Sequence, residues 1–166
     1  MTVETSQAVD LTAIDGILDK HGLEQRSLIP SLLAIQNKYN YLPPDVLQHV
    51  AERMKIPPIQ VYQVASFYKA FSLKPRGRHI VTVCLGTACH VRGGELLLDQ
   101  IDRLLHIKPG ETTKDMQFTV EAVNCLGCCA LGPVMVVDGK YFGSMGVSKV
   151  ERVLNKYMER EVSAND

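Results

Sequence analysis

The chain of 166 residues is poor in several features that mark common classes of protein. It contains no tryptophan, only 6% of its residues are aromatic, and its 18 Lys and Arg residues are balanced by 18 Asp and Glu residues. A neutral chain lacks the basic footprint of a nucleic-acid-binding protein. No apolar run is long enough to span a bilayer. We therefore expect neither a nucleic-acid partner nor direct insertion into a membrane.

Nucleotide-binding and export motifs are absent as well. The sequence has neither G-x-G-x-x-G nor G-x-x-x-x-G-K-S/T, so a nucleotide would have to bind to a partner. Its first residues, MTVETSQAVDLTAID, lack the basic start and apolar block of a signal peptide. We expect a cytoplasmic location, where clustered cysteines bind metal or do redox chemistry more often than they form structural disulfides.

Residues 1–75 predict an N-terminal helical domain. Asp10 and Ser27 stand where they could cap two amphipathic helices, and the proline pairs at 43–44 and 57–58 each precede another helical pattern. The breaker run at 74–77 ends this region. With 46% hydrophobic residues, the chain is able to bury the core of one domain or of two small ones.

Residues 76–166 predict a second domain in which strands alternate with helices. Asp138-Gly139 suits a tight hairpin turn, and Ser148 with Glu151 forms a capping-box pattern that starts a last helix. The order β-α-β-β-α is that of a minimal thioredoxin-like domain. The predicted fold is therefore α/β, a helical bundle followed by a thioredoxin-like domain. Strands are predicted at 79–85, 118–122, 134–137 and 140–142, and the first helix of this domain at 94–105.

Four of the five cysteines form two short pairs, and each pair follows a predicted strand. Cys84 and Cys89 are spaced C-x4-C, Cys125 and Cys129 are spaced C-x3-C, and Cys128 lies inside the second pair. Structural zinc usually uses C-x2-C knuckles, whereas iron-sulfur proteins use wider loops. The spacing favours iron and sulfide. Five glycines would allow the loops to approach closely: Gly86, Gly93, Gly94, Gly127 and Gly132.

Other interpretations of the cysteines stay open from the residues alone. Cys125 and Cys128 form a C-x-x-C, as in thiol-disulfide oxidoreductases, although the motif does not open a long helix. A structural zinc site is a second alternative. His90 could replace a thiolate as in Rieske centres, but these need two histidines and no second one lies near the motifs.

The helix-Pro-Pro-helix arrangement between Val46 and Phe67 suggests one more class, an iron-sulfur transcription factor. The candidate recognition stretch at 59–64 has no Lys or Arg, which argues against DNA binding. We interpret the aromatic residues of this region as part of the helical core or as a docking surface, since aromatics are enriched at interfaces. The candidates are Tyr62, Phe67, Tyr68 and Phe71.

Two runs, VTVCLGTACHVRGGELLLDQI and VNCLGCCALGPVMVVDGKYFG, resemble the thioredoxin-like 2Fe-2S subunit of respiratory complex I and of NAD(P)-linked hydrogenases and formate dehydrogenases. The run YLPPDVLQHVAERMKIPPIQVYQVASFYKAF resembles the N-terminal helical region of that family. By motif, the resemblance implies that one 2Fe-2S cluster is held by Cys84, Cys89, Cys125 and Cys129. Cys128 stands where the family requires no ligand.

The resemblance implies an electron-transfer subunit without catalytic residues of its own. Its expected partner is a flavoprotein that binds FMN and NAD(H), and an iron-sulfur or hydrogenase catalytic subunit is a second expected partner. The runs CLGTACHVRGG and CLGCCALGPVM resemble the soluble hydrogenase and electron-bifurcating type more than the complex I type. A subunit of complex I or of formate dehydrogenase is the alternative.

Overall fold

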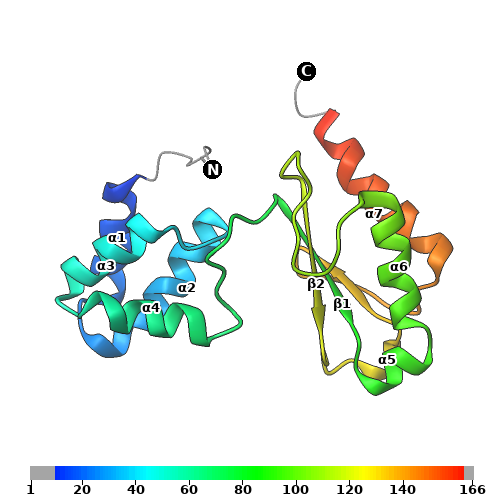
Figure 1. Ribbon diagram of the computed structural model, residues 1–166, viewed down its shortest axis with the longest axis horizontal. Helices are drawn as coiled ribbons and strands as arrows, with labels where there is room; N and C mark the ends of the chain where they lie inside the picture. Colours follow the sequence, from blue (N-terminus) through cyan, green and yellow to red (C-terminus); the bar gives the residue numbers. More distant parts are fainter. Residues whose placement is uncertain (1–9, 163–166) are drawn as a thin grey trace. The chain divides into compact units, whose positions relative to one another are not determined.

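The structure is a computed structural model that describes residues 10–162 (Figure 1). The chain divides into two compact units, of which the first ends at Pro75 and the second begins at Arg76. The first nine residues, on which the expectation of a cytoplasmic location partly rests, lie outside the described residues. Within residues 10–162, no helix combines the length and the apolar character needed to cross a membrane.

Four α-helices and one short 3-10 helix form the described part of the first unit, residues 10–75. Asp10 caps α1 by accepting hydrogen bonds from the backbone N–H groups of Thr12 and Ala13, as its position predicted. Ser27 precedes α2, but its hydroxyl makes no capping hydrogen bond, and it ends the 3-10 helix η1 instead. The elements are α1 (Leu11–His21), η1 (Gln25–Ser27), α2 (Leu28–Tyr39), α3 (Pro44–Met54) and α4 (Pro58–Phe67).

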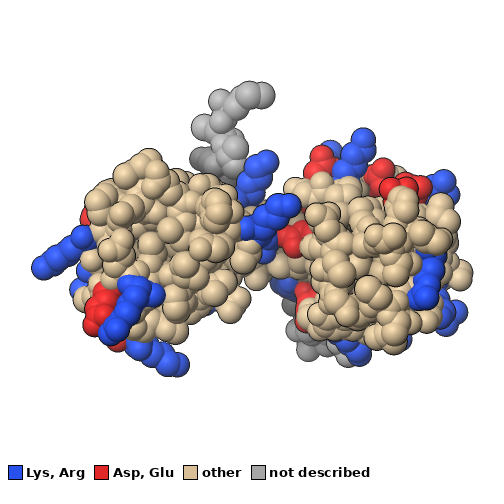
Figure 2. Space-filling view, turned by 90° about the horizontal axis from the view of Figure 1, so that it is seen from below, with Lys and Arg blue, Asp and Glu red and all other residues tan. Residues whose placement is uncertain are grey.

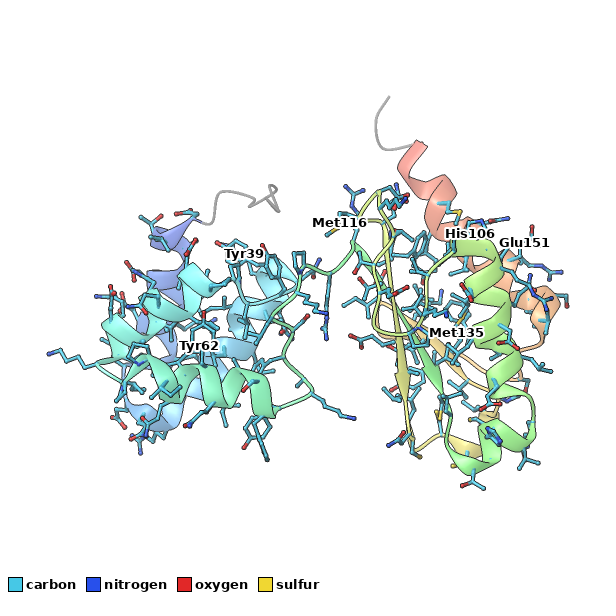
Figure 3. All side chains as sticks on the ribbon, in the orientation of Figure 1. Tyr39, Tyr62, His106, Met116, Met135 and Glu151 are labelled. Atoms are coloured by element: carbon cyan, nitrogen blue, oxygen red, sulfur yellow. The ribbon has the colours of Figure 1, made fainter. Side chains whose placement is uncertain are left out.

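Proline starts α3 and α4, at Pro44 and Pro58, because its missing N–H would be unpaired in the first turn anyway. Aliphatic side chains from all four α-helices fill the core, and Tyr62 packs against it (Figure 3). Phe71, beyond α4, also reaches this core. The fully buried side chains include Ile14, Leu18, Leu32, Ile35, Leu42, Val46, Leu47, Val50 and Val61.

A buried amide fixes the segment that follows α4. Gln36 on α2 donates a hydrogen bond to the carbonyl oxygen of Ala70 and accepts one from the backbone N–H of Ser72, at 2.6 Å. The carbonyl oxygen of Ser72 in turn accepts from the N–H of Leu42 at 2.8 Å. Because the Gln36 side chain is buried, both of its bonds are shielded from water.

The second unit is a four-stranded sheet with helices on one face (Figure 1). The strand order is β2-β1-β3-β4; β1 pairs with β2 in parallel, and the other two pairings are antiparallel. The α/β order of strands and helices predicted for this unit is confirmed. The elements are β1 (His79–Cys84), α5 (Thr87–Val91), α6 (Gly94–Leu105), β2 (Phe118–Val123), η2 (Cys129–Leu131), β3 (Met135–Val137), β4 (Lys140–Phe142) and α7 (Val147–Val162).

The core of this unit lies between the sheet and the helices α6 and α7 (Figure 3). Alternate residues of β1, Val81 and Val83, are fully buried there, as the period of a strand requires. They are joined by Leu97 and Ile101 of α6 and by Met135 of β3. One detail differs from the sequence prediction: α7 begins at Val147, so Ser148 lies inside the helix and is not its N-cap.

Candidate metal centre

The cysteines gather at one edge of the sheet. Cys84 is the last residue of β1 and pairs in register with Val123, the last residue of β2. Since the two strands are parallel, both loops leave the sheet at the same edge, and Cys125 follows two residues after Val123. The chain then returns beside β1, where the carbonyl oxygen of Val134 accepts a hydrogen bond from the Cys84 N–H at 3.1 Å.

Two glycines let these loops approach each other closely. A β-carbon on Gly86 would lie 2.7 Å from the carbonyl oxygen of Asn124 and 3.5 Å from the β-carbon of Cys125. A β-carbon on Gly94 would lie 2.9 Å from the carbonyl oxygen of Cys84 and 3.0 Å from that of Cys89. These distances to carbonyl oxygens are shorter than ordinary β-carbon contacts, so both positions require glycine for steric reasons.

Cys84 and Cys89 are the buried cysteines of the site, with 3% and 2% of their surface exposed. Burial acts to raise the pKa of the Cys84 thiol, but hydrogen bonds from the backbone N–H groups of Gly86 and Leu126 and from the Cys89 thiol outweigh it and lower this pKa. Burial raises the pKa of Cys89, and the neighbouring thiols of Cys84 and Cys129 add to the rise. The opposite directions of the two pKa shifts make Cys84 the more readily deprotonated of the two buried thiols.

Cys125 and Cys129 are exposed, in contrast. The Sγ of Cys125 accepts a hydrogen bond from the backbone N–H of Gly127 at 3.3 Å. Gly127 has a φ of 76°, a left-handed conformation that suits glycine and turns this N–H back toward the sulfur. Backbone N–H groups therefore reach sulfurs in both loops, and such hydrogen bonds stabilise the charge of iron-bound thiolates.

The fifth cysteine, Cys128, is half-buried and packs against the small cluster formed by Cys84, Cys89, Val134 and Val136. It precedes η2, a 3-10 helix of only three residues. The Cys125-x-x-Cys128 motif therefore does not stand at the start of a long helix, whose dipole lowers the thiol pKa in dithiol oxidoreductases. The thiol-disulfide interpretation gains no support from this geometry.

The surroundings of His90 give no indication that it is a metal ligand. Its side chain is half-exposed, and its Nδ1 lies 3.4 Å from a carboxylate oxygen of Glu95. The His90 backbone N–H bonds to the carbonyl oxygen of Gly86, as part of the short helix α5. Sequence reasoning did not predict α5, because a helix of five residues inside a C-x4-C loop is too short to show a periodic pattern.

Sequence reasoning also missed Arg92, whose side chain connects the two loops. Its Nη1 donates a hydrogen bond to the carbonyl oxygen of Cys129 at 3.1 Å and lies 3.3 Å from that of Gly132. The sequence offered one signal for a role of Arg92. It lies three residues after Cys89, and neither of its neighbours in the sequence carries a carboxylate that could pair with it. Both acceptors come from the second loop, so the contact depends on the fold.

The donor set of the two loops consists of cysteine thiolates, which are the ligands of both structural zinc and iron-sulfur clusters. Among residues 10–162, no three His, Cys, Asp or Glu side chains are grouped so that they could hold one metal ion. Structural zinc needs three or four such ligands around one point, whereas a 2Fe-2S cluster has four thiolates distributed over two irons. Two loops, each with a cysteine pair and N–H donors, would supply the four thiolates that such a cluster needs.

A thioredoxin-like sheet with four cysteines in two loops at one edge defines a class, that of small iron-sulfur electron carriers. Comparison with known proteins gives the particular family: the chain belongs to the thioredoxin-like 2Fe-2S ferredoxins, which it matches over residues 14–158. This membership confirms the family resemblance seen in the sequence, and it leaves the transcription-factor interpretation without support.

Curated relatives come from two kinds of enzyme complex. The chain is 37% identical over 130 residues to the NADP-reducing hydrogenase subunit HndA of Solidesulfovibrio fructosivorans, covering 78% of this chain and 76% of the relative. It is 34% identical over 135 residues to an NADH-quinone oxidoreductase subunit of Rhizobium meliloti, covering 81% and 80%. The corresponding NADH-quinone oxidoreductase subunit of Rickettsia prowazekii is 32% identical over 152 residues, covering 90% and 86%.

Among solved structures, the fold resembles part of an NAD+-reducing NiFe-hydrogenase in its air-oxidized state. The TM-score is 0.68 at 21% sequence identity, and the match covers 78% of this chain and 23% of that chain. At this identity the likeness concerns the fold. The described chain is thus similar to a portion of a larger hydrogenase polypeptide.

Proposed function

We propose that this chain is an electron-transfer subunit that carries one 2Fe-2S cluster within a multisubunit NAD(P)H-linked oxidoreductase. The proposed ligands are Cys84, Cys89, Cys125 and Cys129. One observation carries the proposal: in a chain of this family, parallel strands β1 and β2 end side by side and each leads into a cysteine loop. When bound, the cluster would supply one-electron chemistry.

The protein's own contribution is to hold four thiolates and to stabilise their charge. Gly86 and Leu126 direct N–H groups at the Cys84 sulfur, Val134 at the Cys89 sulfur, and Gly127 at the Cys125 sulfur. Four protein thiolates complete the coordination of two irons, so no position is left open for a substrate. The chain would therefore transfer electrons without needing a general acid or base.

Within this class we favour a subunit of an NAD(P)-dependent hydrogenase, because the two cysteine runs resemble that type and one relative is a hydrogenase subunit. Relatives named as NADH-quinone oxidoreductase subunits support the alternative, the corresponding subunit of complex I. In both proposals FMN and NAD(H) bind to a partner flavoprotein. The cytoplasmic location expected from the N-terminus is part of the hydrogenase proposal.

The proposed docking surface of the helical unit consists of helix α4, with Phe67 at its end, and Tyr68, which follows it. No residue of α4 is charged, Phe67 is 78% exposed, and Tyr68 stacks edge-to-face on it. Of the four aromatic candidates from the sequence, Phe67 and Tyr68 are exposed, Tyr62 is half-buried and Phe71 belongs to the core. Figure 2, seen from below Figure 1, shows broad uncharged areas on both units.

Charge indicates what kind of partner surface would fit. The segment 54–94 contains no Asp or Glu, whereas Lys69 and Lys74 follow the exposed aromatics. An apolar partner surface bordered by carboxylates would complement this arrangement. The buried amide of Gln36 holds residues 70–72 in place beside these aromatics, so the docking surface is preorganised.

The test of the cofactor is the iron and sulfide content of the anaerobically prepared chain, with its EPR spectrum after reduction by dithionite. We expect two irons and two sulfides per chain and a rhombic spin-one-half signal. Zinc, or a metal-free chain with a titratable dithiol, would contradict the proposal.

The test of the partner is co-purification of the tagged chain from its native host, with mass spectrometry and flavin analysis. We expect an FMN-containing, NAD(P)-binding subunit and a hydrogenase subunit. Phe67→Ser should reduce recovery of the flavoprotein, whereas Leu11→Ser, at an exposed leucine of α1, serves as the matched control. Proton-pumping membrane subunits without a hydrogenase subunit would favour the complex I alternative.

A further inference from the structure

The Arg92 side chain connects the two cysteine loops. Arg92 closes α5 in the first loop, and its Nη1 donates to the carbonyl oxygen of Cys129 at 3.1 Å in the second. The carbonyl oxygen of Gly132 is a second acceptor at 3.3 Å. One guanidinium thus contacts both ends of η2, the segment that contains Cys129.

Arg92 also brings a positive charge close to the buried cysteines. A β-carbon on Gly132 would lie 3.2 Å from the Cys89 Sγ and 3.5 Å from the Arg92 Nη1. These two distances limit the separation of Nη1 and Sγ to about 7 Å, which is shorter than the screening length of about 8 Å at physiological salt. Arg92 is exposed, and among residues 10–162 no ion pair joins it to a carboxylate.

We propose that Arg92 is a positioning residue for the electron-transfer site, and that it acts in two ways. Its hydrogen bonds hold the Cys129 loop against the Cys89 loop, and its charge favours the reduced state of the site. This inference rests on the proposed function.

The electrostatic role follows from charge balance. A 2Fe-2S cluster held by the four thiolates would supply the one-electron chemistry, and one electron from dithionite would make the net charge of the site more negative by one, with no bond to the protein formed or broken. A fixed positive charge a few ångströms away is attracted more strongly to the reduced site than to the oxidised one. Arg92 therefore raises the reduction potential, for which local charge is one of the determinants.

The experiment uses the full chain, loaded with its cluster under anaerobic conditions. Arg92→Gln removes the charge and the geometry of the guanidinium, and Arg92→Lys keeps the charge but loses the planar fork. Arg103→Gln is the matched control, because Arg103 is exposed and lies about 14 Å beyond the start of α6, past the screening length at about 0.1 M salt. Each variant is titrated with dithionite under EPR, and its bleaching by an iron chelator is followed by visible absorbance.

We expect Arg92→Gln to lower the ratio of reduced to oxidised protein about tenfold at the wild-type midpoint potential. Both Arg92 variants should bleach several-fold faster than wild type, whereas Arg92→Lys keeps a near-normal ratio and Arg103→Gln matches wild type in both measurements. An unchanged ratio in Arg92→Gln would overturn the electrostatic role. Wild-type bleaching rates in both Arg92 variants would overturn the positioning role.

Two further outcomes have defined meanings. If Arg92→Gln fails to retain a cluster, Arg92→Lys decides the positioning role through its bleaching rate. If the wild-type chain itself lacks two irons and two sulfides, the proposed function fails, irrespective of any variant at Arg92.

Discussion

A β-carbon on Gly86 would lie 2.7 Å from the carbonyl oxygen of Asn124, so the first cysteine loop touches the second through a position that has no side chain. Both partners are backbone segments that lead directly to cysteines. Any side chain at Gly86 would therefore have to push Cys125 away from Cys84.

Gly86→Ala should weaken cluster retention and lower the free energy of unfolding by about 1–3 kcal/mol, the usual cost of overpacking. The measurement is iron content after gel filtration, together with urea unfolding. Gly16→Ala is the control, because α1 leaves open space there and alanine is the better helix former by about 0.5–1 kcal/mol. Full iron occupancy in Gly86→Ala would show that the loops tolerate separation.

Serine substitutions test the proposed ligands one by one. Cys84→Ser, Cys89→Ser, Cys125→Ser and Cys129→Ser should each weaken or abolish cluster binding, because a hydroxyl is a poor ligand for iron in this setting. Cys128→Ser should leave two irons bound, since this half-buried thiol is a packing residue in our assignment. A Cys128→Ser chain that lost its iron would overturn the ligand assignment.

Asp15 makes the helical unit sensitive to acid. A hydrogen bond from His49 Nε2 at 2.8 Å, helped by the charge of Arg53, lowers the pKa of the Asp15 carboxyl from its ordinary value of 3.8. A lowered pKa stabilises the fold above pH 3.8, and this contribution disappears as the pH falls through the folded-state value.

Asp15→Asn should therefore be less stable than wild type at neutral pH, and the difference should shrink as the pH falls below 3.8. Urea unfolding at several pH values measures it. Asp19→Asn is the matched control, because Asp19 makes only an exposed contact with Arg53, at 3.0 Å. A difference that stayed constant with pH would contradict the role given to Asp15.

Gln36 should control how firmly the segment beside the exposed aromatics is held. Gln36→Ala leaves the Ser72 N–H and the Ala70 carbonyl without their partner, at a cost of about 1–3 kcal/mol. Hydrogen exchange at the Ser72 amide should accelerate, while the iron content stays normal. Gln48→Ala, which removes only a surface bond to Glu52, should change neither; protection of Ser72 in Gln36→Ala would disprove the role.

Much of the fold follows from local sequence patterns. Pro44 and Pro58 start their helices, Asp10 caps the first one, and Asp138-Gly139 forms the hairpin turn with both residues at positive φ. These features depend on a few neighbouring residues, which is why the sequence predicts them. The start of α7 was harder to predict, since Val147 joins the helix before the capping-box serine.

The sequence pointed to the cysteines of the candidate site, but not to the way the folded chain arranges them in space. The cysteine spacings pointed to two loops, because each pair follows a run of β-branched residues. That the loops meet depends on the parallel pairing of β1 with β2, which is a long-range contact. The sequence did suggest that Gly86 and Gly94 allow close approach, and the structure adds the carbonyl oxygens that they approach. The contacts of Arg92 were not predictable, since its acceptors lie in the second loop, which only the folded chain brings close.

The unequal burial of the cysteines has a practical consequence. Cys84 and Cys89 lie inside the protein, whereas Cys125 and Cys129 face the solvent. Oxidants and chelators attack accessible thiols first, so damage should begin on the second loop and leave the inner pair intact for longer. A partner bound over that loop would protect these thiols from oxidants. The isolated chain should therefore be oxidised faster in air than a chain bound to such a partner.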